Sequence, residues 1–192
     1  MSNDILKTKK ELIEIGRQIA AKGLVIGPGG NISARTGGSM VISASGSSFE
    51  TSTEDDYVAV DIATGKAEEG AKRPSSEVLM HLECYRRRPE INAVVHTHPT
   101  WSTSVASAGI KMPPMFPDYV VFVGDPATLD YVIPTTKLLA DAVGGVIADH
   151  IRECGNPVGL DLSKNEGQEV LRGRRSDTTS CFWTYPFPGL EE

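Results

Sequence analysis

The sequence contains few cysteines, no long apolar run and no extended basic run. Its three cysteines among 192 residues are an odd number without a close pair, which argues against a disulfide framework and favours a reducing compartment. No stretch approaches the roughly 18 uninterrupted apolar residues that a membrane helix needs. The first residues also lack the apolar block of a secretion signal. We therefore expect a cytoplasmic protein that does not insert into a membrane.

Acidic residues outnumber basic ones. The chain has 25 Asp and Glu against 19 Lys and Arg, so its formal net charge is −6. Its longest basic run is the arginine triplet at 86–88. Surfaces that bind nucleic acid are usually basic, so we expect no nucleic-acid partner. An apolar fraction of 40% with 23% charged residues is typical of a globular protein.

The order of apolar and turn residues predicts one α/β domain over residues 1–150. Helical spacing of apolar residues predicts helices over 5–21, 77–88, 100–108 and 135–150, the last with Leu138 and Val143 on its apolar face. Short apolar runs bounded by turn residues predict strands at 31–35, 40–43, 57–61, 91–98, 119–123 and 131–133. Residues 151–192 show no sustained period, so we expect no regular element in that segment.

His96 and His98 are the first candidates for a chemical role. Side chains alternate along a strand, so this spacing places both imidazoles on one face, with Cα atoms about 7 Å apart. Imidazole is a favoured ligand of zinc and its first-row neighbours, and a catalytic zinc usually has three protein ligands. The alternative is a pair of half-buried histidines that hydrogen-bond to their neighbours.

Glu77 is the candidate general base. It follows Ser75 and Ser76, either of which can cap the helix that begins near Glu77. A carboxylate beside a bound metal can move a proton that the cation has acidified. The alternative is that Glu77 only compensates the helix dipole. His81, one helical turn further on, is expected to be a packing or surface residue.

Three segments offer small groups that suit an anion. They are the loop GPGGN that ends at Asn31, the Ser45–Gly46 turn and the helix start at Ser75 and Ser76. Backbone N–H groups and hydroxyls in such segments bind phosphates, although glycines also simply form turns and serines simply cap helices. Together with the metal candidates, these segments favour a phosphorylated small molecule as the substrate.

The motifs GGNIS, SASG, RPSSE and INAVVHTHP occur in this order, and together they resemble the class II aldolase and adducin family. The resemblance implies a three-layer α/β/α sandwich with a central, mainly antiparallel sheet, assembled as a homotetramer. It also implies cleavage of a carbon–carbon bond in a small ketose phosphate through an enediolate. The alternatives are epimerisation, dehydration or decarboxylation, which other family members perform, and a non-catalytic domain of the adducin type.

The resemblance also assigns roles to individual residues. Glu77 matches the acid/base residue that can also contact the metal, and the metal, most often zinc, is bound by His96 and His98. The residues that match the family's phosphate pocket are Asn31, Ser45, Gly46, Ser75 and Ser76.

One family motif is missing. The family supplies a third metal-binding histidine on a strand after the helix that is expected to end near His150, and residues 151–192 contain no histidine. His150 itself falls at the helix end rather than on that strand. The abrupt change suggests that residues 151–192 arose from a shifted reading frame or a replaced segment. We therefore expect a weaker metal site and an exposed apolar sheet edge.

Overall fold

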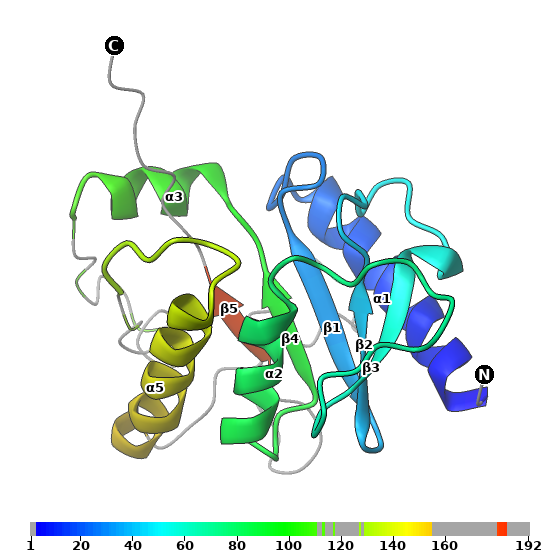
Figure 1. The fold of residues 1–192 in the computed structure, drawn as a ribbon. Helices are drawn as coiled ribbons and strands as arrows, with labels where there is room; N and C mark the ends of the chain where they lie inside the picture. Colours follow the sequence, from blue (N-terminus) through cyan, green and yellow to red (C-terminus); the bar gives the residue numbers. More distant parts are fainter. Residues whose placement is uncertain are drawn as a thin grey trace.

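The computed structural model describes residues 3–110, 113, 117, 127, 129–154 and 180–183. Most of the expected helices and strands are present within a few residues of their expected bounds (Figure 1). In chain order they are α1 (Asn3–Ala21), β1 (Asn31–Thr36), β2 (Ser39–Ser43), η1 (Glu54–Asp56), β3 (Tyr57–Asp61), α2 (Val78–Arg87), β4 (Ala93–His96), α3 (Thr100–Ser107), α5 (Lys137–Cys154) and β5 (Ser180–Trp183). No helix within these residues is long and apolar enough to cross a membrane.

The described strands form one sheet in the order β3-β2-β1-β4-β5. β1 pairs antiparallel with β2 and with β4, and β2 pairs antiparallel with β3, whereas β5 lies parallel to β4. The expectation of a mainly antiparallel sheet is therefore confirmed. In the ladder between β1 and β4, Asn31 lies opposite His96. This register brings together two candidate site residues that are far apart in the sequence.

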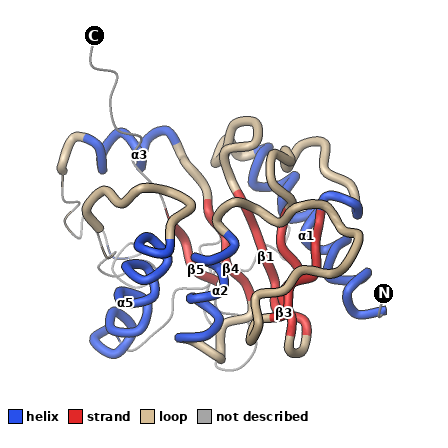
Figure 2. The backbone as a smooth tube through the Cα atoms, in the orientation of Figure 1, coloured by secondary structure: helices blue, strands red, loops and turns tan. Residues whose placement is uncertain are grey.

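Helices cover both faces of the sheet, with α1 on one side and α2 and α5 on the other (Figure 2). Val41 and Ile42 are neighbours on β2 and are both fully buried, yet they belong to different apolar clusters. Val41 packs with Leu12 of α1, and Ile42 packs in the cluster that contains Val143 of α5. Strand alternation explains this division, because successive side chains point to opposite faces.

The structure corrects several expectations near the end of the chain. Residues 131–133 form no strand, since β1 and β5 already pair with both edges of β4. The helix α5 continues to Cys154, and β5 occupies the sheet edge that was expected to be exposed. Leu138 is 69% exposed rather than part of the apolar face of α5. The strand expected at 119–123 lies outside the described residues, and the division of the chain at residue 150 stays a prediction.

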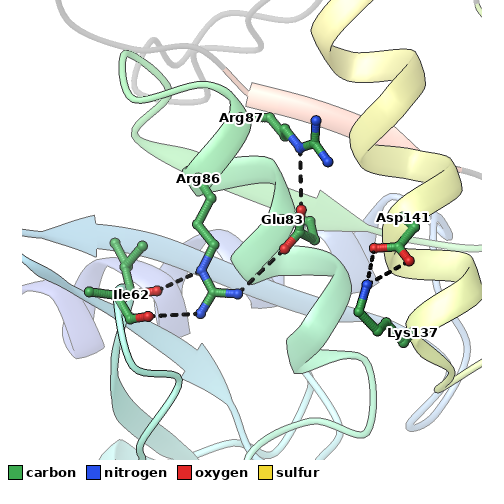
Figure 3. Close-up of polar contacts among 7 residues, drawn as sticks. Ile62, Glu83, Arg86, Arg87, Lys137 and Asp141 are labelled. Atoms are coloured by element: carbon green, nitrogen blue, oxygen red, sulfur yellow. Dashed lines mark hydrogen bonds and ion pairs between the residues drawn. The ribbon is translucent and has the colours of Figure 1, made fainter.

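Helices α2 and α5 pack against each other beside a set of exposed ion pairs (Figure 3). Glu83 accepts hydrogen bonds from Arg86 Nη1 and Arg87 Nε, each at 3.4 Å, and Lys137 Nζ lies 2.6 Å from Asp141 Oδ1. Exposed pairs of this kind contribute little to stability. Gly144 of α5 faces α2 at this contact, and an added Cβ there would lie 3.4 Å from Glu83 Cβ.

We expect Gly145→Ala to raise the free energy of unfolding by about 1 kcal/mol. Glycine is less favourable than alanine in a helix interior by about this amount, and a Cβ at Gly145 would meet no atom within 4 Å. Gly144→Ala is expected to gain less, because its Cβ would touch Glu83. Urea unfolding of the two variants measures the difference. A loss of stability in Gly145→Ala would contradict the helical packing described for α5.

Candidate active site

A pocket of about 170 Å³ lies where five parts of the chain meet. Ligand pockets for drug-sized molecules hold roughly 300–1,000 Å³, so this pocket suits a small metabolite better than a polymer. Its lining residues are Pro28, Gly29, Gly30, Asn31, Ala44, Ser45, Gly46, Ser75, Ser76, Glu77, His98, Pro134 and Thr135. These residues include every site residue predicted from the sequence except His96, which is buried and in contact with Glu77.

Two of the segments that supply small residues to the pocket lie side by side. An isolated bridge joins Ala44 to Pro74, and the Ser45 backbone N–H donates to Arg73 O at 2.9 Å. The Ser45 N–H is therefore already used within the protein, so the hydroxyl of Ser45 is the group that it can offer to an anion. Gly46 has a φ of +78°, a conformation that favours glycine. The turn between β2 and η1 can thus present backbone atoms near Gly46 to the pocket.

Glu77 occupies the N-cap position of α2 rather than its first turn. The Ser75 hydroxyl accepts a hydrogen bond from the Glu77 backbone N–H at 3.3 Å, so Ser75 organises the residues before the helix and does not cap it. The Glu77 side chain is only 11% exposed, and its Oε2 contacts His96 Nδ1. Asn31 Nδ2 donates to the same Oε2 at 3.1 Å. Glu77 therefore does more than compensate the helix dipole.

The charge state of Glu77 is set by competing effects. Burial alone would raise the pKa of its carboxyl, but the contact with His96 and the hydrogen bond from Asn31 outweigh burial and hold this pKa below its ordinary value. The side chain is therefore a carboxylate at neutral pH, which is the form that accepts a proton or binds a cation.

The imidazoles of His96 and His98 lie together, with ring centroids 4.7 Å apart. The Nδ1 atom of His96 contacts Glu77, whereas its buried Nε2 has no hydrogen-bond partner among the described residues. Buried polar atoms usually have partners, and a bound metal would supply the missing one. The nearby donors, two imidazoles and one carboxylate, are ligands that zinc accepts. No three His, Cys, Asp or Glu side chains of the described residues surround a single point as a complete metal site.

Sequence reasoning missed the hydrogen bonds of His81 and the role of Thr135 in the pocket. His81 is a packing residue, one of the two expected alternatives, and it is fully buried and hydrogen-bonded to Asn31 and Ser33. Its spacing of one helical turn from Glu77 was the available signal for these contacts. Thr135 lines the pocket with a φ of +65°, which is unusual for a β-branched residue. Nothing in the local sequence predicts that conformation.

Comparison with known proteins shows a family and a fold. Residues 10–158 match the sequence model of the family described as "Class II Aldolase and Adducin N-terminal domain". An L-fuculose 1-phosphate aldolase of known structure is 33% identical, with a TM-score of 0.68 over 78% of this chain and 69% of that one. The L-fuculose-1-phosphate aldolase from Thermus thermophilus is 26% identical, with a TM-score of 0.65 over 74% of this chain and 71% of that one.

A third similar structure leaves the type of reaction open. YgbL from Escherichia coli is 26% identical, with a TM-score of 0.66 over 76% of this chain and 72% of that one. It is described by three alternative activities, namely aldolase, epimerase and decarboxylase. The shared fold therefore supports several reactions, and the side chains of the pocket must carry the argument for any one of them.

Proposed function

Because the chain belongs to the class II aldolase and adducin family, we propose that it is a metal-dependent lyase that cleaves a carbon–carbon bond in a small ketose phosphate. The observation that carries this proposal is the contact between the Glu77 carboxylate and His96 beside a pocket lined by small hydroxyl and glycine residues. The similarity to two L-fuculose 1-phosphate aldolases supports a ketose 1-phosphate as the substrate class.

The proposed roles divide the pocket into two parts. Ser45, Gly46, Ser75 and Ser76 bind the phosphate and thereby place the sugar. Glu77, in the same pocket, takes the proton of the hydroxyl on the departing carbon. The carbon–carbon bond then breaks, an aldehyde forms, and the electron pair stays on the carbon next to the ketone. Glu77 returns the proton to that carbon, so the reaction consumes no other reactant.

Asn31 lines the pocket, where it was expected, and it also contacts the base. Its amide nitrogen donates to Glu77. We propose that Asn31 contributes to both parts of the site. Its amide positions the Glu77 carboxylate, and the residue also contacts the substrate phosphate.

A divalent cation would supply positive charge that stabilises the anion left on the substrate, and the preference of zinc for imidazole makes zinc the proposed metal. Glu77, His96 and His98 are the residues that would hold it. The buried Nε2 of His96, which has no hydrogen-bond partner among the described residues, supports this assignment. We further propose a cytoplasmic homotetramer in which each complete chain forms a three-layer α/β/α sandwich. The helices on both faces of the sheet support that architecture.

One observation favours a second candidate, a non-catalytic domain. Within the described part of the chain, the histidines and acidic residues do not form a set of three around one point. A catalytic zinc usually needs three protein ligands, so a chain without a third ligand would keep the fold and lose the reaction. Epimerisation, dehydration and decarboxylation remain the alternatives if the metal binds and no cleavage follows.

The purified full chain is expected to contain about one zinc ion after incubation with zinc and gel filtration, as measured by elemental analysis. His96→Ala should weaken zinc binding by more than the roughly 10–100-fold that accompanies loss of an outer-sphere partner. Asp141→Asn is the matched control, because Asp141 pairs with the exposed Lys137 away from the pocket. Absence of zinc from the wild-type chain would favour the non-catalytic domain.

Cleavage itself is tested with L-fuculose 1-phosphate and other ketose 1-phosphates. Dihydroxyacetone phosphate is the expected product, and its reduction by an NADH-dependent coupling enzyme measures the rate. Bound zinc without this product would contradict cleavage and direct the test to epimerisation or decarboxylation.

A further inference from the structure

Four buried side chains form a continuous hydrogen-bonded chain that ends at Glu77. Tyr85 Oη lies 2.8 Å from Ser33 Oγ, and Ser33 Oγ lies 2.7 Å from His81 Nδ1. His81 Nε2 lies 2.5 Å from Asn31 Oδ1. These four residues, from Tyr85 to Asn31, are called the Tyr85–Asn31 chain below. Each is at most 8% exposed, so water does not compete for these hydrogen bonds.

The direction of every hydrogen bond in the Tyr85–Asn31 chain follows from its end at Glu77. A carboxylate only accepts, so Asn31 must present its amide nitrogen to Glu77. Its carbonyl oxygen then faces His81 and requires a donor, which is the Nε2–H of His81. His81 is fully buried and both of its ring nitrogens face uncharged partners, an environment that disfavours a charged imidazole, so the ring carries a single N–H.

The remaining two hydrogen bonds are then determined as well. With its proton on Nε2, His81 accepts at Nδ1, and the Ser33 hydroxyl must donate there. The Ser33 oxygen in turn accepts from the Tyr85 hydroxyl. All four groups thus donate in one direction, toward Glu77.

We propose that His81 is a positioning residue: held as its Nε2–H tautomer by Ser33 and Tyr85, it sets the orientation of the Asn31 amide and so holds Glu77 against His96. The importance of this for catalysis rests on the proposed function, whereas the tautomer and the amide orientation do not. If the Asn31 amide turned over, its oxygen would face the Glu77 carboxylate, and the two acceptors would repel each other. Glu77 would then leave the position at which it meets His96.

A purely structural role for His81 makes a different prediction. Buried polar groups can often be replaced by apolar groups of similar shape with little change in stability. If His81 only filled space between α2 and β1, an apolar residue of similar size would serve, and the properties of Glu77 and His96 would not change.

The first test is the tautomer in the wild-type full chain. NMR of protein labelled with ¹⁵N at histidine distinguishes a protonated from an unprotonated ring nitrogen. At pH 7 we expect His81 to carry its proton on Nε2 and none on Nδ1, and Ser33→Ala to make that preference weaker. A proton on Nδ1, or a charged ring, in the wild-type protein would overturn the proposal whatever the protein binds.

The second test is zinc affinity, measured by competition with a chromogenic chelator. His81→Leu should weaken zinc binding by about 10–100-fold, as loss of outer-sphere partners does. His81→Gln should recover most of this loss, because its amide N–H can still donate to Asn31. Circular dichroism and thermal unfolding establish that each variant is folded. Equal losses in the two variants, or no loss in either, would overturn the proposal.

Two controls keep the outcomes separate. If His81→Leu does not fold, Tyr85→Phe interrupts the far end of the Tyr85–Asn31 chain with the loss of one oxygen atom, and it should give a smaller loss of zinc affinity in the same direction. No change in zinc affinity in a folded Tyr85→Phe, with the His81 tautomer also unchanged, would count against the directed chain. If the wild-type chain binds no zinc, the proposed function fails while the tautomer measurement still decides the role of His81.

Discussion

Glu77→Gln is expected to lower kcat for ketose 1-phosphate cleavage by about 10²–10⁴-fold, the range that a general acid or base contributes. Glutamine has nearly the same shape as glutamate and can still accept the hydrogen bond from Asn31 through its amide oxygen. The variant therefore removes the proton acceptor and the negative charge with little change in packing. Release of dihydroxyacetone phosphate measures the loss.

Glu83→Gln is the matched control for this experiment. Glu83 lies in the helix that follows Glu77 and is half-buried, with 20% side-chain exposure, but it pairs with Arg86 and Arg87 rather than with the pocket. Glu83→Gln should retain activity within a few-fold of the wild type, as the exposed arginines make only weak pairs. A Glu77→Gln enzyme with near wild-type kcat would show that Glu77 is not the residue that moves the proton.

Gly30→Ala is expected to lower the free energy of unfolding by about 1–3 kcal/mol, the usual effect of overpacking a filled site. An added Cβ at Gly30 would lie 2.8 Å from the backbone oxygen of His96, 2.9 Å from Val25 Cγ2 and 3.2 Å from Phe49 Cε2. The first of these contacts is with backbone, which cannot rotate away as a side chain can. The alanine must therefore displace the end of β4, where His96 lies.

Gly38→Ala separates this effect from the general consequence of replacing glycine. A Cβ at Gly38 would meet no atom within 4 Å, so we expect a stability within about 0.5 kcal/mol of the wild type, as for most surface substitutions. Urea unfolding compares the two variants, and zinc binding reports whether His96 has moved. Equal stabilities for Gly30→Ala and Gly38→Ala would contradict the close approach of the glycine loop to β4.

The neighbouring positions of several candidate side chains could be predicted because these residues are close in the sequence. His96 and His98 were expected on one face of a strand; β4 ends at His96, yet the ring of His98 still lies beside that of His96. A serine pair before an amphipathic run predicts the start of α2 and places Glu77 beside it, with an error of one position at the cap. In both cases only a few consecutive residues are involved, so no distant contact had to be known.

The end of the chain was harder to predict, because whether a segment there forms a strand depends on the strands beside it. Residues 180–183 have no periodic pattern in the surrounding sequence, yet as β5 they pair with β4. The segment 131–133 has apolar residues suited to a strand and forms none. A strand exists only where another strand offers free N–H and C=O groups, and the sequence of a short segment does not contain that information.

Local spacing was enough to predict an α/β domain, and the order of four motifs carried the resemblance to the family, which implied the mainly antiparallel sheet and the candidate site residues. Three relations emerge only when the chain is folded: Asn31 faces His96 across two strands, His81 lies buried behind Asn31, and Gly30 approaches the backbone of β4. They join residues 50 to 66 positions apart in the chain, and they arise from strand register and from the packing of α2 on the sheet. Strand register and helix packing depend on contacts throughout the core, and for that reason a local sequence motif does not predict them.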